Sequence, residues 1–579
     1  MNWSLKKRPD ADLEALIRSH GPLLGSTLWS RGFVASMADS IQTFLSPRLE
    51  SLRSPVLMKN MSACVDRLLA AREHGECVCV YSDYDMDGIS GLALLKSFLE
   101  ASGFGNLRHF QPDRLAEGYG VHPAALEKLH AEGVHLVITV DTGTTALEAI
   151  RRAQSLGLDV MITDHHQQVG ELPATPWIIN PNQQGDESGL GYLSGAGVAF
   201  YLCMALRGRI RELGLFGNAL AEPDLRQWLD LYCLGTIGDV VNLVDDNRTL
   251  VRAGLPQLAR TRRPGLKLLL DAVLDPAARL NLSARDVAFS VVPKLNAASR
   301  MGEAHLSTEL LTTSDESRAR DIVERILELN ALRSKIQSEI FEEAVAQATK
   351  LLEEVPHTRV LTLRGAWHEG VLGIVAAKIA ELFFLPTIVL AETHEGKLRG
   401  SMRTRGAYDC VKILEGASTL LDRFGGHTAA AGMQFDADKW ELFREALQKH
   451  VDSIYRADGV ESETQYFDGE LSPADAPSVD EVLKLKSMEP FGAGNPEPLF
   501  LMKRISLSDF ELLTGTHIKM KRPMLPEMIG FSKAAEIGRL KELGTQHVDA
   551  LLIPEINTFR NQSRVQLRIQ HLRASEPTS

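Results

Sequence analysis

Short apolar segments alternate with helix-like segments in the first third of the chain. Residues 76–82, 135–140 and 158–163 are short, apolar and rich in β-branched side chains, as buried strands are. Apolar residues at helical spacing follow the first two strands, over residues 88–102 and 144–156. Strands that alternate with helices form parallel sheets, so this pattern predicts an α/β domain built on a parallel sheet.

Acidic residues stand where the predicted strands end. The first strand runs into the segment Asp83–Gly88, the second into Asp141, and the third into Asp164-His165-His166. In open α/β sheets ligands bind at the carboxyl ends of the strands. We therefore expect the three acidic strand ends to converge on one site.

Two simpler interpretations of Asp83–Gly88 are weaker. The spacing of its three Asp residues resembles the start of an EF-hand, but the twelfth loop position is Leu94 instead of a bidentate Glu. A strand, and not a helix, precedes the segment. Asp is also favoured as a helix cap, which explains one Asp and not three.

The set of acidic and imidazole side chains indicates a metal centre. Asp239 ends another apolar segment and adds a further carboxylate to the strand-end residues. Carboxylates with one or two imidazoles suit Mn²⁺ or Mg²⁺, and histidine favours Mn²⁺. Two such ions roughly 3.5–4 Å apart can clamp the attacking and leaving oxygens of a phosphoryl transfer. A shared carboxylate such as Asp141 would bridge two divalent cations.

The rest of the chain divides into further segments. Apolar residues at helical spacing predict one long helix over residues 317–355, without Pro or Gly. A second, smaller α/β unit follows, with a Gly-rich turn at Phe424–Met433 and a predicted helix at 436–451. Alternating residues 565–570 near the end predict a β-domain, in which Arg564, Gln566 and Arg568 share the face away from the core.

Composition sets bounds on location and partners. The 579 residues are enough for several domains, and no segment has the roughly 18 unbroken apolar residues that a membrane helix needs. Six scattered cysteines without a Cys-x-x-Cys pair, and an N-terminus without an apolar signal, favour a cytoplasmic protein that contacts no membrane. The net charge of −12 means that a nucleic acid would need a locally basic channel.

The four acidic motifs, in this order, resemble the DHH phosphoesterase superfamily, and Phe424–Met433 resembles its companion DHHA1 domain. The chain length and the segments Pro293–Gly302 and Glu489–Pro496 resemble the single-strand-specific 5′→3′ DNA exonucleases of that superfamily. The resemblance implies an α/β multidomain protein with a parallel-sheet DHH domain, a long linking helix, a smaller α/β DHHA1 domain and a C-terminal OB-like β-barrel. The expected ranges are an N-terminal segment 1–45, a DHH domain 46–316, a connecting helix 317–355, a DHHA1 domain 356–456 and an OB-fold 457–579.

The resemblance also assigns roles to individual residues. It implies five metal ligands, namely Asp85, Asp87, Asp141, His165 and Asp239. It places His166 beside the scissile phosphate, with Asp83 as a catalytic residue that supports the ligands. It implies a substrate-binding set of Arg114, Tyr119, Arg300, Ser401, Arg403, Gly426 and His427. Without the resemblance, a surface ion pair for Arg114 and core packing for Tyr119 are the commoner interpretations.

One position departs from the superfamily. The small pyrophosphatases of the superfamily have a histidine four residues before the first ligand Asp. This chain has Tyr81 at that position, so pyrophosphatase activity is not expected.

The expected activity is hydrolysis of single-stranded DNA from the 5′ end to 5′-mononucleotides, in DNA repair and recombination. The resemblance implies a monomer that binds single-stranded DNA and works with a single-strand-binding protein and a helicase. One alternative is a phosphodiesterase for short oligonucleotides or cyclic dinucleotides, which would need no OB-like domain. Another is a non-catalytic DNA-binding scaffold, but such proteins lose ligands and none of the expected ones is missing.

Overall fold

The computed structural model describes residues 2–5, 10–114, 117–406, 408–455, 464–472, 476–513, 515–522, 525–559 and 562–576. Contacts divide the chain into two units, which we call the central unit (Arg53–Glu461) and the terminal unit (Met1–Leu52 with Ser462–Ser579). The terminal unit thus joins the predicted N-terminal segment to the predicted C-terminal domain. No helix among the described residues is long and apolar enough to cross a membrane.

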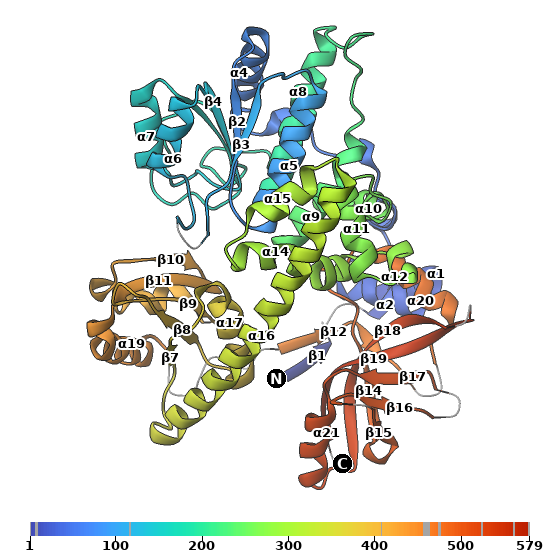
Figure 1. Ribbon diagram of the computed structural model, residues 1–579. Helices are drawn as coiled ribbons and strands as arrows, with labels where there is room; N and C mark the ends of the chain where they lie inside the picture. Colours follow the sequence, from blue (N-terminus) through green and yellow to red (C-terminus); the bar gives the residue numbers. More distant parts are fainter. Residues whose placement is uncertain are drawn as a thin grey trace. The chain divides into compact units, whose positions relative to one another are not determined.

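The central unit begins with the predicted parallel sheet, whose five strands lie in the order β3-β2-β4-β5-β6. Figure 1 labels β2, β3 and β4 of this sheet. The strands are β2 (Val78–Ser82), β3 (Leu107–Phe110), β4 (Leu136–Val140), β5 (Asp159–Thr163) and β6 (Ile178–Ile179). The helices around this sheet are α4 (Met61–His74), α5 (Met86–Ala101), α6 (Pro123–Ala131), α7 (Leu147–Leu156) and α8 (Gly195–Glu212), and a 3₁₀ turn at Pro55–Leu57 precedes them.

The order of the strands fixes where a ligand binds. From β2 the chain moves outward to β3, and it then returns to the other side of β2 to form β4, so the order reverses between β2 and β4. Both strands are fully buried, because helices cover each face of the sheet. Ligands of open α/β sheets bind at the carboxyl ends of the strands at such a reversal. Asp83 and Asp141 directly follow these two strands.

A helical region covers the carboxyl ends of the strands and leads into the long helix. It consists of α9 (Leu229–Gly238), α10 (Asp245–Ala259), α11 (Pro264–Val273), α12 (Pro276–Leu280), α13 (Ala284–Asp286), a π-helical turn at Val287–Val291, α14 (Val292–Arg300) and α15 (His305–Thr312), with a 3₁₀ turn at Leu225–Trp228 before α9. Helix α9 packs against α5 and α10, and nearly all of its residues are buried. This packing fixes the end of α9, where Asp239 lies.

The predicted long helix is confirmed as α16 (Glu316–Glu354). Its N-terminus is capped by Asp315, whose side chain accepts hydrogen bonds from the Ser317 and Arg318 N–H groups. The first half packs against α11, α14 and α15, and the second half packs against α17 and β7. Leu332, between the two halves, is 48% exposed, because it lies where the elements that pack against the helix change.

The second sheet of the central unit has the order β10-β11-β9-β8-β7, with β7 and β8 parallel and the other neighbours antiparallel. Its strands are β7 (Leu361–Gly365), β8 (Thr387–Glu392), β9 (Lys397–Arg403), β10 (Arg423–His427) and β11 (Ala430–Asp436). Its helices are α17 (Leu372–Phe383), α18 (Cys410–Glu415) and α19 (Trp440–Ile454), with 3₁₀ turns at Glu369–Val371, Ser418–Leu420 and Ala437–Lys439. One core contains α16 and α17, and the other contains α18 and α19.

Two predictions for this region were wrong in detail. The Gly-rich segment Phe424–Met433 is a strand pair instead of a simple turn, because Gly425 lies opposite Gly432 in an antiparallel ladder. The predicted helix at 436–451 begins at Trp440, because residues up to Asp436 continue the strand that pairs with β9.

The terminal unit contains a seven-stranded sheet in the order β13-β14-β18-β19-β17-β16-β15. Its strands are β13 (Gly469–Glu470), β14 (Phe500–Ser506), β15 (Phe510–Leu512), β16 (Ile518–Met520), β17 (Glu527–Gly530), β18 (His547–Phe559) and β19 (Gln562–Ala574). A separate parallel pair joins β1 (Asn2–Leu5) to β12 (Thr464–Phe467). The α-helices are α1 (Asp10–His20), α2 (Pro22–Ser30), α3 (Ala38–Leu45), α20 (Val479–Leu485) and α21 (Ala534–Glu542), with 3₁₀ turns at Leu49–Ser51, Lys486–Met488 and Leu507–Asp509.

The N-terminal helices belong to the core of this sheet. Leu16, Leu24 and Leu28 are buried in one cluster with Phe500 and Leu567 from the sheet. This is the sheet of the predicted OB-like domain, and among its described residues the two edge strands, β13 and β15, do not pair with each other.

The prediction that Arg568 lies on an open face was wrong. Arg568 is 5% exposed and pairs with Glu497 at 2.8 Å and with Glu555. Arg564, on the same strand, is exposed as predicted. A buried arginine held by two carboxylates is a structural ion pair, so Arg568 does not contribute to a nucleic-acid surface.

Candidate metal centre

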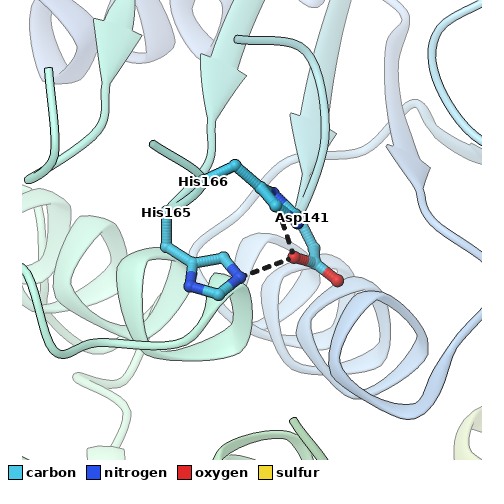
Figure 2. A group of neighbouring side chains, drawn as sticks. All are labelled: Asp141, His165 and His166. Carbon is cyan, nitrogen blue, oxygen red and sulfur yellow. Dashed lines mark ion pairs between the residues drawn. The ribbon is translucent and has the colours of Figure 1, made fainter. Parts of the chain in front are cut away.

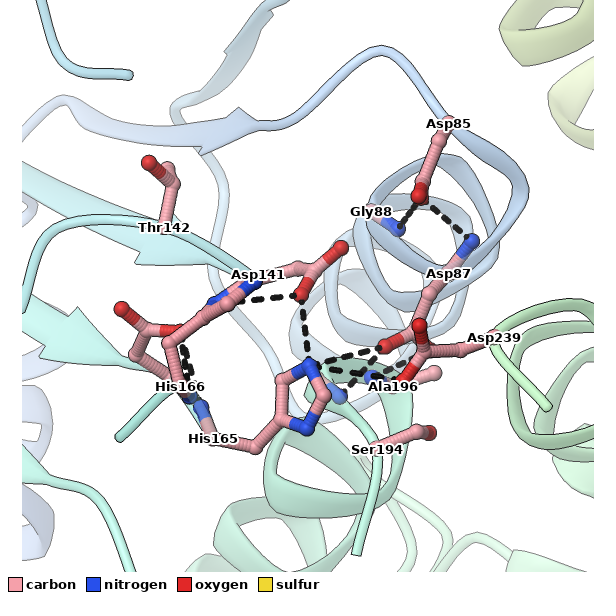
Figure 3. Close-up of polar contacts among 12 residues, drawn as sticks. Asp85, Asp87, Gly88, Asp141, Thr142, His165, His166, Ser194, Ala196 and Asp239 are labelled. Atoms are coloured by element: carbon pink, nitrogen blue, oxygen red, sulfur yellow. Dashed lines mark hydrogen bonds and ion pairs between the residues drawn. The ribbon is translucent and has the colours of Figure 1, made fainter. Parts of the chain in front are cut away.

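The turn from β2 to α5 supplies three carboxylates. Asp85 caps α5, because its Oδ1 accepts hydrogen bonds from the N–H groups of Asp87 (2.9 Å) and Gly88 (3.2 Å) (Figure 3). Asp87 is fully buried, and its two oxygens accept hydrogen bonds from Gly195 N–H (2.5 Å) and Ala196 N–H (3.0 Å) at the start of α8. The N-terminus of one helix therefore holds a carboxylate of another.

The ends of β4 and β5 supply the next groups. Asp141 has a φ of 62°, which is uncommon for a residue other than glycine and is concentrated at functional sites. Asp164 is buried and accepts the N–H groups of Thr144 (2.9 Å), His165 (2.8 Å) and His166 (3.2 Å). It also pairs with His166 Nδ1 at 2.7 Å. Asp164 therefore holds the turn that carries both histidines.

One imidazole nitrogen lies among three carboxylates. His165 Nε2 is 3.1 Å from Asp141 Oδ1, 3.5 Å from Asp239 Oδ2 and 3.9 Å from Asp87 Oδ2 (Figures 2 and 3). These groups come from the ends of β4, β5 and α9 and from the first turn of α5. Segments far apart in sequence thus converge on one point, as the strand-end pattern predicted.

Three overlapping groups of donor atoms can each surround a cation, with the atoms of a group within 4.8 Å of one another. One group is Asp87, His165 and Asp239, a second is Asp83, Asp85 and Asp141, and a third is Asp141, His165 and His166. Because Asp141 and His165 each belong to two groups, cations bound in neighbouring groups would share donors. Asp83, expected to support the ligands, lies in the second group as a donor itself.

The carboxyl groups raise one another's pKa. Burial and then repulsion from Asp85 raise the pKa of Asp87 to about 7. Burial, with Asp87 and Asp85, raises the pKa of Asp239 to about 9. Burial and the surrounding carboxylates also raise the pKa values of Asp83 and Asp141 well above the usual range. A cation among these groups would favour their ionised forms.

The two histidines differ in charge. Burial lowers the pKa of His165 to about 4, so its imidazole is neutral and can donate an electron pair to a metal. Burial also opposes charge on His166, but the hydrogen bond and charge of Asp164 outweigh it and raise the pKa of His166 to about 9. His165 is thus suited to bind a metal, and His166 is suited to face an anion.

The donor set fits divalent cations. Asp83 Oδ1, Asp141 Oδ1 and His165 Nε2 are buried. Within the described part of the chain, Asp83 Oδ1 has no hydrogen-bond partner, and the other two atoms have none apart from their ion-pair contacts. Such atoms cost free energy unless a ligand satisfies them. Oxygen donors with one imidazole suit Mn²⁺ and Mg²⁺.

Several predicted substrate residues lie in the same pocket as the metal donors. This pocket has a volume of about 320 Å³. Its lining includes the predicted Arg114, Tyr119 and Arg300 together with Asp83, Tyr84, Asp85, Asp141, His166, Gly238, Asp239 and Asn296. The Tyr119 hydroxyl is 3.4 Å from His166 Nδ1, so Tyr119 contacts the site and is not a core residue.

The second sheet carries the other predicted residues, and one of them, His427, contacts a residue that lines this pocket. The His427 ring lies 6.3 Å from the His166 ring and nearly parallel to it. Arg403 Nη1 donates to the Ser401 hydroxyl at 2.5 Å, and Arg300 Nη1 donates to the Gly370 carbonyl at 3.0 Å. Gly426 has a φ of 154°, and a Cβ there would lie 2.2 Å from the Ala430 carbonyl oxygen, so only glycine fits.

The arginines of this region lie close enough to repel one another. Burial, then repulsion from Arg114, Arg403 and Arg333, lowers the pKa of Arg300 to about 9. Burial also lowers the pKa of Arg403, and Arg114 adds to this effect. A phosphate among Arg114, Arg300 and Arg403 would relieve the repulsion.

Some residues of the site were missed from sequence. The guanidinium of Arg114 lies 4.8 Å from the centre of the Tyr84 ring, and Asn296 and Gly238 line the pocket. The N–H groups of Gly195 and Ala196 hold Asp87, and the only sequence signal was Ser194, a good helix cap directly before two small residues. Arg399, on the same strand as Ser401 and Arg403, pairs with Glu369 at 2.8 Å.

The comparisons with known proteins agree with this geometry. Residues 77–236 match the DHH family N-terminal domain, residues 357–453 the DHHA1 domain, and residues 467–571 the RecJ OB domain. Each range lies inside the corresponding predicted range. The sheet order, the converging donors and the second sheet therefore define a DHH phosphoesterase with a DHHA1 domain.

Similarity over the full chain defines the family more narrowly. The chain is 32% identical to the single-stranded-DNA-specific exonuclease RecJ of Bacillus subtilis, over 100% of this chain and 71% of the relative. It is 32% identical to the RecJ of Dickeya dadantii over 98% of both chains, and 33% identical to that of Escherichia coli over 89% and 90%. The crystal structure of Thermus thermophilus RecJ with Mn²⁺ superposes with a TM-score of 0.81 and 28% identity, over 100% of this chain and 80% of that one. The chain belongs to the RecJ family.

Proposed function

We propose that this protein is a single-stranded-DNA-specific 5′→3′ exonuclease that releases 5′-mononucleotides by two-metal hydrolysis and acts in DNA repair and recombination. The observation that carries the proposal is one pocket in which metal donors of three linked groups face two arginines, Arg114 and Arg300. The proposal is also supported by the activity named for the relatives.

Two of the three donor groups act as cation sites in the proposed reaction. Asp87, His165 and Asp239 would hold one cation, and Asp83, Asp85 and Asp141 would hold the other. Two Mn²⁺ or Mg²⁺ ions would activate water and stabilise charge on the phosphate. His166 would donate from Nε2 to a phosphate oxygen, because Asp164 holds its Nδ1.

Arg114, Arg300 and Arg403, which we call the arginine cluster, would set the direction of digestion. Arg300 and Arg403, with the Ser401 hydroxyl and the backbone at Gly426 and His427, would bind the terminal 5′-phosphate. Arg114 would bind the next phosphate, and the Tyr119 ring, 47% exposed, would stack on a base. Binding the terminal phosphate beside the metals places the first phosphodiester at the donors.

The terminal unit would hold the rest of the strand. A groove of about 990 Å³ in this unit is lined by the cations Lys519, Lys521, Arg522 and Arg564. A groove lined by such cations attracts phosphates, even though the chain as a whole carries a net negative charge. We further propose that the enzyme is a cytoplasmic monomer and receives its strands from a single-strand-binding protein and a helicase.

Digestion of strands labelled at either end tests the proposal. A single strand with Mn²⁺ should release 5′-labelled mononucleotide from the start of the reaction, whereas a 3′ label should stay on long fragments. Duplex of the same sequence should resist, and chelation of the metal should stop release. Mononucleotides that first appear from the 3′ end, or undiminished release after chelation, would contradict the proposal.

Substitution of the groove cations separates a DNA exonuclease from a phosphodiesterase for short oligonucleotides or cyclic dinucleotides. Replacing both Lys521 and Arg564 by alanine should raise KM for strands of thirty nucleotides about 10-fold, because each cation neutralises a phosphate. Hydrolysis of a 5′-phosphorylated dinucleotide should not change, and the slope of affinity against salt should fall by about 2.

A matched pair in the same unit controls for net charge. Lys503 and Lys541 are exposed and lie outside the groove lining, so alanine at both should leave the long-strand KM unchanged. An equal loss in both double variants would argue for general attraction instead of a groove.

A further inference from the structure

Two asparagines lie beside the turn that carries the histidines. Strand β6 is the edge of the parallel sheet, and Thr163 of β5 pairs with Ile179 of β6. Asn180 and Asn182 directly follow β6, so this pairing places them next to Asp164-His165-His166. Neither asparagine was assigned a role from sequence.

Asn180 is fully buried and uses its whole amide. Its Nδ2 donates to the His166 carbonyl at 2.8 Å and to the Thr144 hydroxyl at 2.8 Å. Its Oδ1 accepts the Asn182 N–H at 2.8 Å. The same Thr144 donates its N–H to Asp164 at 2.9 Å. Asn180 therefore links the His166 main chain to the residue that holds the Asp164 side chain.

Asn182 makes the corresponding contact with the other histidine. Its Nδ2 donates to the His165 carbonyl at 2.6 Å and to the Gly191 carbonyl at 3.1 Å. A Cβ at Gly191 would lie 2.5 Å from Asn182 Oδ1, so the surrounding loop packs closely on this amide. Pro181 between the two asparagines restricts the backbone that presents them.

The main chain of the two histidines is thus held from two sides. Asp164 accepts the N–H groups of His165 and His166, and the asparagines donate to their carbonyls. A carboxylate of the same size cannot do this, because it has no donor and would repel the carbonyl oxygens. Fixing the main chain fixes the Cα–Cβ direction from which the His165 ring reaches the other donors, and hydrogen-bond partners behind metal ligands typically contribute 10–100-fold to metal affinity.

We propose that Asn180 and Asn182 are positioning residues that set the imidazole of His165 for metal binding through its main chain, an inference that rests on the proposed two-metal function. Their effect is on the occupancy of the metal centre and not on the arginine cluster. Losing either amide should therefore lower the affinity for the metal and leave the affinity for a 5′-phosphorylated strand unchanged.

The test is a titration of the full-length protein with Mn²⁺, followed by the electron paramagnetic resonance signal of free Mn²⁺. Asn180→Ala and Asn182→Ala should each bind Mn²⁺ about 10–100-fold more weakly than the unsubstituted protein. Digestion should fall at limiting Mn²⁺ and recover when Mn²⁺ is raised, which a general loss of structure would not produce. Asn180→Asp keeps the size of the side chain and should behave like Asn180→Ala.

Asn495→Ala is the matched control. Asn495 is also buried and donates to two carbonyls, those of Met488 and Pro490, but it lies in the terminal unit. Its replacement should lower stability comparably and leave the affinity for Mn²⁺ unchanged. If Asn180→Ala does not fold, the partly exposed Asn182 still provides the test.

The outcomes separate this inference from the proposed function. Folded Asn182→Ala with unchanged Mn²⁺ affinity would overturn the positioning role, whatever its nuclease activity. If the unsubstituted protein binds Mn²⁺ but releases no nucleotide from single strands, the proposed function fails while the Mn²⁺ titration still tests the asparagines.

Discussion

Gly195→Ala is expected to lower the initial rate of single-strand digestion by on the order of 10³-fold. A Cβ at Gly195 would lie 2.5 Å from Asp141 Cβ and 2.8 Å from Asp141 Cα. The N–H of Gly195 also donates to Asp87, so any movement of α8 displaces two predicted ligands at once. Release of 5′-labelled nucleotide at saturating Mn²⁺ measures the effect.

Gly208→Ala on the same helix is the control. Nothing lies within 4 Å of a Cβ at Gly208, and alanine stabilises a helix by about 1 kcal/mol over glycine. We expect unchanged digestion and a higher free energy of unfolding for this variant. Normal digestion by Gly195→Ala would mean that the start of α8 does not position the metal ligands.

Arg300→Ala is expected to lower digestion of 5′-phosphorylated strands by about 10²–10³-fold, because hydrogen bonds to a charged group contribute about 1.5–3 kcal/mol each. Arg300 lies in the pocket between the metal donors and the second sheet, where it donates to the Gly370 carbonyl. The digestion of strands with a 5′-hydroxyl should fall much less, so any preference of the enzyme for a 5′-phosphate should disappear. Parallel measurement of kcat/KM on both substrates gives the ratio.

Two further variants sharpen this test. Arg300→Lys keeps the charge but not the two-pronged donor, and it should fall between Ala and the native residue. Arg325→Ala removes an exposed arginine that pairs with Glu303 and Glu328, and it should have no effect. Equal losses on both strand types in Arg300→Ala would assign Arg300 to another phosphate.

The metal donors could be predicted from sequence because strand periodicity carries positional information. Once β2, β4 and β5 are recognised as neighbouring parallel strands, their carboxyl ends must meet, and Asp83, Asp141 and His165 follow them. The contribution of Gly195 and Ala196 could not be predicted in this way. Their donors are main-chain N–H groups, which have no side-chain signature, and only the packing of α8 against α5 brings them to Asp87.

Arg568 shows a different limit of the sequence. Alternation along β19 correctly predicted that Leu567 and Ile569 are buried. It could not reveal that Glu497 and Glu555 cover the opposite face at Arg568, because they lie 71 and 13 residues away in the chain. Alternation also stops after Ile569, where the pairing of β18 with β19 shifts register.

The division of the chain has a consequence for biosynthesis. The terminal unit combines segments that lie before and after the central unit in the chain, so α1 and α2 emerge from the ribosome before the central unit and their core partners after it. Leu16, Leu24 and Leu28 stay unburied until residues 462–579 have been made, whereas the central unit is complete earlier. The nascent chain thus carries these apolar side chains unburied while the central unit is made, which favours binding by a chaperone before the terminal unit closes.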